Sequence, residues 1–249
     1  MGGRGGDIYL YDGAHVTIKE NLNEGNDLVL VQADSYTLGD NIENAMAWVD
    51  EGYISDINIT GNKLDNSIFG SYGSNVLDGG DGNDVIAGFG GDDLLKGGTG
   101  SDTFVWSVQG FEGTVTDFTA ISNTNQALAK DKIGLAFAPV DDGAVGSKAL
   151  TYDLSHLSDA ASANGTQFTL NGSDEMKQAQ VIYDKSTGLL QIDIPVWDTS
   201  THTWGVRDGQ ADAQMFVNAD ASGTLPTSLT ADDFVVVPDN RDWTHHPMT

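Results

Sequence analysis

Short apolar segments recur every nine residues between Gly61 and Val105. The stretch divides into five consecutive units: GNKLDNSIF, GSYGSNVLD, GGDGNDVIA, GFGGDDLLK and GGTGSDTFV. In each unit a glycine-rich half precedes a strand-like half. The eighth position is always a large apolar residue: Ile68, Leu77, Ile86, Leu95 and Phe104. This period suits a parallel β-roll, in which two units make one turn and the eighth position faces the interior. We therefore predict an all-β fold with a parallel β-roll over residues 61–106.

Before this block, residues 1–60 keep β-prone apolar segments but lose the nine-residue phase after Leu10. Further strands are therefore predicted here, with a short helix over Ile42–Val49. Asn23, Asn26 and Asp27 are interpreted as turn residues rather than ligands. The expected strands are His15–Ile18, Leu28–Val31, Tyr36–Leu38 and Ile54–Ile59.

After the block, the pattern predicts an antiparallel β cap within residues 107–237, followed by a tail at 238–249. Gln180–Asp193 has two apolar-rich segments around the sequence DKSTG, which indicates a β-hairpin. Ala213–Val217 and Phe234–Val237 are predicted to be further strands.

The polar half of each unit offers ligands for a metal ion. Asp84, Asp93 and Asp102 occupy the sixth position of the last three units. Glycines let the backbone turn sharply and point its carbonyls inward. An oxygen-lined gap between stacked loops suits Ca²⁺, which takes about 6–8 oxygen ligands, whereas the repeats hold no thiol or imidazole for a transition metal. Glycine and aspartate also mark ordinary turns, but that alternative does not explain five units in phase with their apolar positions.

The units resemble the calcium-binding repeats of the RTX (repeats-in-toxin) family of secreted bacterial proteins. The resemblance implies several Ca²⁺ ions that stabilise the roll. It pairs Asp84 with Asp102 on one side and sets Asp93 opposite Asn75 on the other. It also implies backbone carbonyl ligands from Gly80, Gly82, Gly97 and Thr99. Asn66 and Asn75 hold the sixth position of the first two units, and a neutral amide is a poorer calcium ligand, so these turns are expected to bind weakly or not at all.

Gly2–Leu10 matches a complete unit and is interpreted as the last unit of an upstream run. On this reading the chain is a fragment of a larger protein, and Asp7 has an incomplete metal site. Tyr9 stands where Phe104 stands, and both aromatic rings are expected to plug an end of the coil.

The sequences VTDF at Val115–Phe118 and KDKIGL at Lys130–Leu135 resemble the region that follows RTX repeats. The resemblance implies that Asp117 and Asp131 complete a last calcium site. The alternative is that both are structural turn aspartates.

Composition narrows the function further. The net charge is −26, with 11 Lys and Arg and no Cys. Repulsion at this charge would disfavour the compact state until cations bind. Because there are no disulfides, bound calcium is expected to supply the stabilisation that they would give. No basic patch for nucleic acid is present, so nucleic acid is not an expected partner. No apolar run reaches the roughly 18 residues that a transmembrane helix needs.

We therefore expect a calcium-binding module of a secreted or cell-surface protein, which stays unfolded in calcium-poor cytosol, passes through type I secretion machinery and folds outside. One alternative is an adhesin, surface-layer or polysaccharide-binding module. There, Trp197 and Trp204 would stack on a sugar or protein partner, unless they cover the hairpin's own core. Another is the C-terminal part of an exoenzyme (protease, lipase or epimerase) with its catalytic domain upstream. The chain itself has no HExxH, G-x-S-x-G or P-loop motif, so we expect no catalysis in it.

Overall fold

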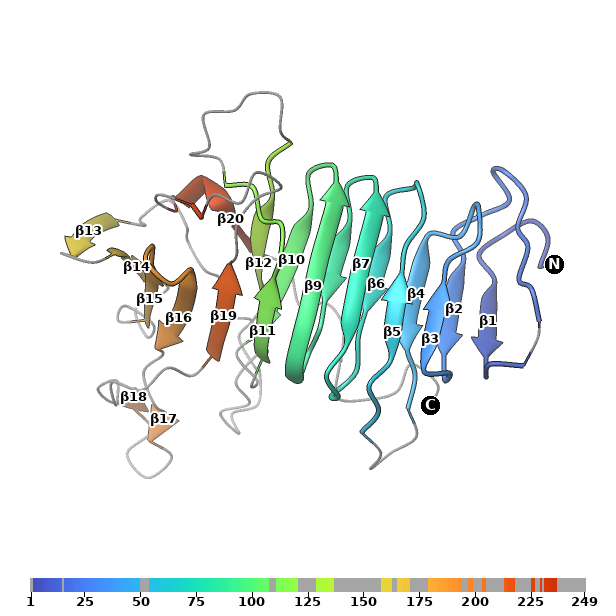
Figure 1. The fold of residues 1–249 in the computed structure, drawn as a ribbon, viewed down its shortest axis with the longest axis horizontal. Helices are drawn as coiled ribbons and strands as arrows, with labels where there is room; N and C mark the ends of the chain where they lie inside the picture. Colours follow the sequence, from blue (N-terminus) through green and yellow to red (C-terminus); the bar gives the residue numbers. More distant parts are fainter. Residues whose placement is uncertain are drawn as a thin grey trace.

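Two sheets of parallel strands, one of them extended by antiparallel strands at its end, face each other in a β-solenoid that runs along the long axis of the molecule (Figure 1). The computed structural model describes residues 2–14, 16–49, 54–107, 111–120, 129–136, 158–162, 165–170, 179–193, 197–198, 203–204, 213–217, 225–226, 229 and 231–236. Within these ranges the regular structure is strand, apart from one short 3₁₀ helix at Ala231–Asp233. The predicted all-β fold with a parallel β-roll is confirmed.

The first sheet, here called sheet A, has eight strands, all parallel. In spatial order they are β1 (Ile8–Tyr11), β2 (Leu28–Val31), β4 (Asn44–Ala47), β6 (Ser67–Phe69), β8 (Val85–Ala87), β10 (Thr103–Ser107), β12 (Lys132–Ala136) and β20 (Phe234–Val236).

The second sheet, sheet B, has ten strands. Six of them continue the solenoid as parallel neighbours: β3 (Ser35–Thr37), β5 (Asn58–Thr60), β7 (Val76–Asp81), β9 (Gly91–Thr99), β11 (Phe111–Val115) and β19 (Ala213–Val217). Beyond β19 the sheet becomes antiparallel through β16 (Leu189–Asp193), β15 (Ala179–Asp184), β14 (Gly165–Leu170) and β13 (Ser158–Ser162).

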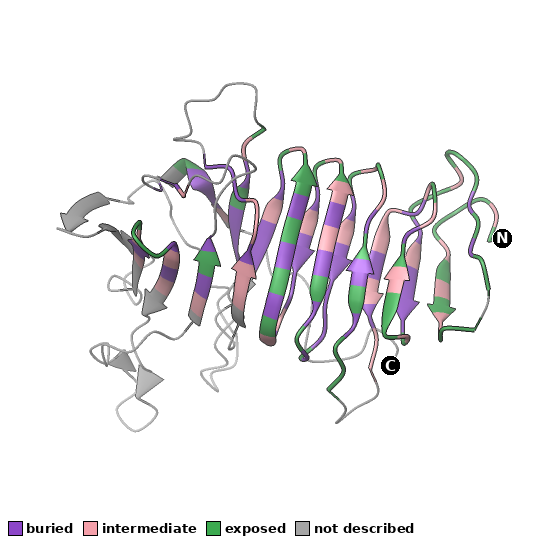
Figure 2. Ribbon diagram, in the orientation of Figure 1, coloured by how far each residue is buried: buried purple, intermediate pink, exposed green. Residues whose placement is uncertain are grey.

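The register repeats every eighteen residues within the block. Ser67 pairs with Val85 and Val85 with Thr103 in sheet A, while Val76 pairs with Leu94 in sheet B. The eighth position of each unit therefore forms a continuous inward stack in each sheet, and all five of these residues are fully buried. Figure 2 shows the result as buried bands that alternate with exposed bands along β9 and mainly with intermediate bands along β7. Burial of this stack supplies the core that the nine-residue period predicts.

The stack extends well beyond the repeat block. In sheet A, Tyr9, Val29 and Ala45 lie in register on one side of Ile68, and Ile133 and Phe234 lie on the other side of Phe104. Phe104 is thus in the middle of the core, and the prediction that it plugs an end of the coil is wrong. Tyr9, in the terminal strand β1, is only partly buried against the core.

Several local predictions are also corrected. Residues 44–47, placed in a predicted helix, form strand β4, because Ala45 and Ala47 alternate inward between their neighbours in β2 and β6. Val16–Ile18 form no strand. The strands predicted at Leu28–Val31 and Ala213–Val217 are found with those bounds, and the predicted hairpin is β15–β16.

The prediction of an antiparallel cap for the C-terminal part is only partly right. Strands β19 and β20 add to the solenoid in parallel with β11 and β12, and the antiparallel meander β13–β16 is attached through β19. Trp197 and Trp204 pair on a two-stranded sheet, β17 (Trp197–Asp198) and β18 (Thr203–Trp204). The predicted tail lies outside the described residues. Among the described residues, none of the helical structure is long and apolar enough to cross a membrane.

Candidate metal centre

A row of polar residues stands at the start of sheet A. The residue directly before each of seven successive strands is acidic or Asn, and the strand register aligns these residues turn by turn. We call this row the turn ladder: Asp7, Asp27, Glu43, Asn66, Asp84, Asp102 and Asp131. Five of the seven residues are at most 4% exposed, the exceptions being Asp7 and Glu43.

Successive members of the turn ladder are joined by side chain to backbone hydrogen bonds. The Asn66 N–H donates to Asp84 Oδ1 at 2.7 Å, and the Asp84 N–H donates to Asp102 Oδ1 at 2.9 Å. The same contact joins Asp7 to Asp27 at 2.8 Å and Asp102 to Asp131 at 3.0 Å. One oxygen of each accepting carboxylate is thereby fixed by the backbone of the preceding turn. At Asp84 and Asp102 the second oxygen is left for another partner.

That second oxygen is turned toward the start of its own unit. A Cβ on Gly79 would overlap the Asp84 carboxylate, and a Cβ on Gly97 would overlap that of Asp102. Glycine is required at these places by space rather than by conformation. The second positions, Gly80 and Gly98, instead have φ of 101° and 99°, which favours glycine for conformational reasons.

Two sixth-position carboxylates of the repeat block carry a buried oxygen with no hydrogen-bond partner among the described residues: Asp84 Oδ2 in the turn ladder and Asp93 Oδ2 on the sheet B side. Burial raises the pKa of both residues from 3.8 to about 7, and the neighbouring Asp102 charge adds to the effect at Asp84. Burial also raises the pKa of Asp102 to about 6 and that of Asp131 to about 7. A buried, unpartnered carboxylate oxygen is costly unless a cation accompanies it. The residues present therefore fit a hard cation such as Ca²⁺.

Asn66 shows what happens where the ladder has an amide instead. Its Nδ2 donates to the carbonyls of Ile42 at 3.1 Å and Glu43 at 3.2 Å, while its Oδ1 accepts the Asn62 N–H at 2.8 Å. Asn62 Nδ2 donates to the carbonyls of Gly39 and Ile42. Amide donors thus satisfy the loop carbonyls in this gap, and this supports the expectation that the turn binds calcium weakly or not at all.

Asp93 lies on the sheet B side, where its Oδ1 accepts the Asn75 N–H at 2.8 Å. Asn75 is satisfied within its own unit, because its Oδ1 accepts the Ser71 N–H at 2.7 Å. The next residue in register after Asp93 is Gly113, so no further carboxylate follows on this side. The second position of the Asp93 unit is Phe89, which keeps a φ of 76° and stacks on Phe69 at 6.3 Å between ring centroids.

The predicted carbonyl ligands lie at the interface between stacked loops. The Thr99 carbonyl accepts the Gly82 N–H at 2.9 Å. A Cβ on Gly98 would overlap the Gly80 carbonyl, and one on Gly100 would overlap the Gly82 carbonyl. The Gly97 carbonyl would lie 2.6 Å from a Cβ on Gly79. All four carbonyls therefore line the gap between the loops that carry Asp84 and Asp102.

Asp117 and Asp131 close the array at its far side. Asp117 accepts the N–H groups of Gly97 at 3.0 Å and Gly98 at 2.9 Å. Asp131 accepts those of Asp102 at 3.0 Å and Thr119 at 2.7 Å. Both oxygens of each carboxylate already accept a backbone hydrogen bond, so the geometry favours structural turn aspartates over ligands of a last ion.

The structure also reveals two units that sequence reasoning missed. Residues 22–30 (LNEGNDLVL) and 38–46 (LGDNIENAM) have their acid at the sixth position and Val29 or Ala45 at the inward eighth. Asn23 replaces a glycine at the second position with φ 62°, and Asn41 replaces one at the fourth position with φ 64°. Asparagine tolerates this left-handed region better than other residues with a side chain. A search that accepted Asn for Gly, Leu at the first position and Glu for Asp at the sixth would have found both units.

Glu20 adds a carboxylate to the turn ladder in this region, where it lies beside Asp7 and Asp27. Asp27, interpreted from sequence as a turn residue, is 1% exposed. Glu20 belongs to no unit of the repeat.

Comparison with known families agrees with this geometry. Residues 60–104 match the RTX calcium-binding nonapeptide repeat in four copies. The matched segment is thus a calcium-binding module, and proteins that carry such repeats are generally secreted. A comparison with curated proteins finds no significant match to the chain.

Proposed function

We propose that this chain is a calcium-dependent folding module that stabilises a larger secreted or surface protein. The observation that carries the proposal is the pair of buried carboxylate oxygens on Asp84 and Asp93 that lack a hydrogen-bond partner among the described residues. A folded roll must bury these charges, and a net charge of −26 adds to the repulsion. Calcium, when bound, supplies the compensating positive charge.

The chain's own residues do the remaining work. Asp84 and Asp102 each hold one oxygen on the backbone of the preceding turn and present the other to the loop gap. The first glycine of each unit leaves room for the carboxylate. Carbonyls of Gly80, Gly82, Gly97 and Thr99 complete the oxygen lining that we assign to the ion. Because this arrangement exists only in the folded chain, the free energy of ion binding becomes free energy of folding.

The same linkage suggests how the module could be exported. In calcium-poor cytosol the carboxylates would repel one another and keep the chain unfolded, as threading through a type I secretion apparatus requires. Outside the cell, millimolar calcium would fold the roll. We place no catalytic step in this chain, and any enzymatic activity of the larger protein would reside elsewhere.

The test is far-UV circular dichroism and calcium titration of the chain. In EGTA we expect a spectrum of an unfolded chain, and with millimolar CaCl₂ the spectrum of a β protein. MgCl₂ at the same concentration is the matched control for ionic strength and charge, and it should leave the chain largely unfolded, because Mg²⁺ demands a stricter geometry. A β spectrum that is the same in EGTA and in calcium would refute the proposal.

A further inference from the structure

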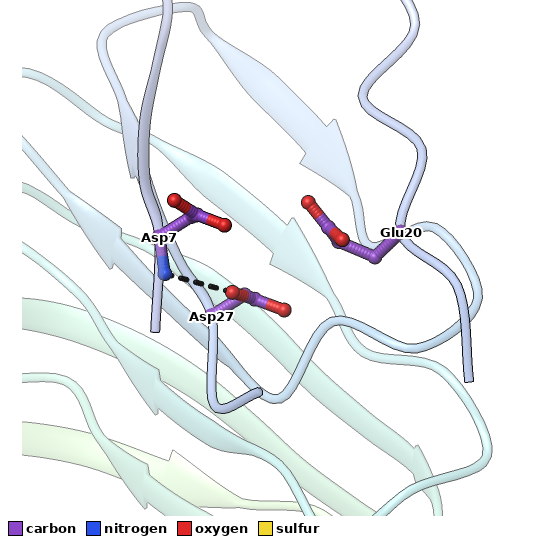
Figure 3. A group of neighbouring side chains, drawn as sticks. All are labelled: Asp7, Glu20 and Asp27. Carbon is purple, nitrogen blue, oxygen red and sulfur yellow. Dashed lines mark hydrogen bonds between the residues drawn. The ribbon is translucent and has the colours of Figure 1, made fainter. Parts of the chain in front are cut away.

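Three carboxylates converge at the N-terminal end of the roll, outside the segment that matches the repeat family. Asp7, Glu20 and Asp27 each contribute one oxygen to a group in which all oxygens lie within 4.8 Å of one another. Figure 3 shows the three side chains turned toward a common space, with Asp7 and Asp27 from successive turns and Glu20 from the loop between them. The cluster lies outside residues 60–104, the segment that matches the repeat family, and Glu20 holds no position in any repeat unit.

Two of the three residues are buried, Asp7 is partly buried, and no ion pair among the described residues compensates their charge. Glu20 is 7% exposed and Asp27 is 1% exposed. Glu20 Oε2 and Asp7 Oδ2 are buried without a hydrogen-bond partner among the described residues. The ion pair found in the described part of the chain joins Lys96 to Asp78, in the repeat block, and involves none of the three.

The other oxygens of the cluster are held in place by hydrogen bonds. Asp27 Oδ1 accepts the Asp7 N–H at 2.8 Å. Glu20 Oε1 accepts the Gly2 N–H at 3.2 Å and the hydroxyl of Tyr9. Each of these two acids therefore has one oxygen fixed by the protein, and the unpartnered oxygens of Asp7 and Glu20 face the shared space. Three like charges this close repel strongly unless a cation sits among them.

We propose that Asp7, Glu20 and Asp27 form a calcium site in which Glu20, a residue outside the repeat pattern, adds a third carboxylate to the sixth-position aspartates of two successive turns. An all-oxygen, all-carboxylate set suits a hard cation and disfavours zinc or copper. Loop-borne ligands suit the flexible coordination of Ca²⁺ better than the strict octahedron of Mg²⁺. Glu20 supplies a third carboxylate, where the repeat pairs have two. Since affinity rises with the number of charged ligands, this site should fill at lower calcium concentration than the repeat sites. It also supplies the partners that Asp7 was expected to lack.

The experiment compares the whole chain with Glu20→Gln and with a matched control, Glu24→Gln. Glu24 lies in the same loop, and its carboxylate accepts hydrogen bonds from Asn21 rather than joining the cluster. Isothermal titration calorimetry with CaCl₂ should show one bound ion fewer for Glu20→Gln and the wild-type number for Glu24→Gln. The lost ion should be the one that binds most tightly. Asp27→Asn should lose the same ion while keeping an oxygen for the Asp7 N–H, which serves if Glu20→Gln does not fold.

A second readout uses Tyr9. Terbium replaces calcium in oxygen sites and emits when a nearby tyrosine is excited, so Tyr9→Phe should reduce terbium emission. Because the Tyr9 hydroxyl holds Glu20 Oε1, the same variant should also weaken calcium binding at this site while the repeat sites keep their ions. Equal stoichiometry and affinity in Glu20→Gln, Asp27→Asn and wild type would overturn the proposal, as would equal affinity of the site for Mg²⁺. The proposed folding role fails separately, because it predicts a calcium-dependent β spectrum even in Glu20→Gln.

Discussion

Replacing Asp84 with Asn should change stability in opposite directions with and without calcium. Without calcium, the wild-type roll buries an unpartnered carboxylate oxygen at Asp84, close to the charge of Asp102. An amide removes the charge and supplies donors. The chain already contains the outcome at Asn66, one turn away, where the amide donates to the carbonyls of the preceding turn. By the same register, Asn at position 84 would reach the carbonyls of Asp65 and Asn66.

The magnitude follows from the two opposing contributions. Relief of an unsatisfied buried polar group is worth about 1–3 kcal/mol, and more when the group is charged. Loss of one ion costs about 4 kcal/mol when free calcium is roughly 1,000-fold above the dissociation constant. Asp84→Asn should therefore stabilise the calcium-free roll by about 1–3 kcal/mol and destabilise the calcium-loaded roll by about 1–3 kcal/mol. At about 2–4 °C per kcal/mol for a protein of this size, the melting temperature shifts by roughly 2–12 °C in each direction.

The assay is thermal unfolding followed by circular dichroism, in EGTA and in CaCl₂, with equal sucrose in both so that a folded calcium-free state is measurable. Asp81→Asn is the matched control. Asp81 belongs to the same unit and is exposed, and its Oδ1 accepts the Thr99 hydroxyl at 2.8 Å, which an amide oxygen can still do. Asp81→Asn should shift both melts by little. Equal destabilisation of Asp84→Asn in both buffers would refute the reasoning, because Asp84 would then be a structural acceptor and not a cation ligand.

Three further predictions address the same architecture. Gly97→Ala puts a methyl group onto the Asp102 carboxylate, so calcium titration should show weaker binding at the Asp84–Asp102 pair. Phe104→Ala empties the middle of the sheet A stack, and urea unfolding in calcium should show a loss of about 3–5 kcal/mol; a much smaller loss would mean that Phe104 is not central. The pH dependence of stability should have opposite signs with and without calcium. Burial raises the pKa of Asp84 and Asp93 from 3.8 to about 7. Without calcium, the protonated carboxyl groups therefore stabilise the folded state fully below about pH 4, and this stabilisation is lost as the pH rises through about 7. With calcium, protons compete for the same carboxylates, so acidification from pH 8 to pH 5 should lower the melting temperature instead of raising it.

The sequence predicts the core of the repeat block well because the residues that determine each turn and strand lie within a single unit. Each unit carries its own turn residues and its own inward residue, and the register of Ile68, Ile86 and Phe104 follows from a constant spacing. The same locality allows the contrast between Asp84 and Asn66 to be anticipated from residue chemistry.

The units around Asp27 and Glu43 were missed for a specific reason. A nonapeptide unit is recognised by its glycines, but what the backbone needs at those places is a positive φ. Asn23 and Asn41 meet that need with φ of 62° and 64°, and the intervening loops change the spacing between turns from eighteen residues to twenty, sixteen and twenty-three. Glu20, which lies in such a loop, has no position in any repeat. Its role is visible only once the fold brings it to Asp7 and Asp27.

The end of the solenoid escapes sequence reasoning because its contacts are non-local. Strand β19 pairs with β11 through Glu112 and Gln214, and β20 pairs with β12 through Ile133 and Phe234. Each strand adds in parallel to an edge that the preceding turn must already provide. The antiparallel strands β13–β16 are attached only through β19. Long-range parallel pairing gains nothing until its template exists. If calcium folds the repeat block as proposed, its sites therefore control more than their own turns, because without a formed roll the C-terminal strands have no edge on which to fold.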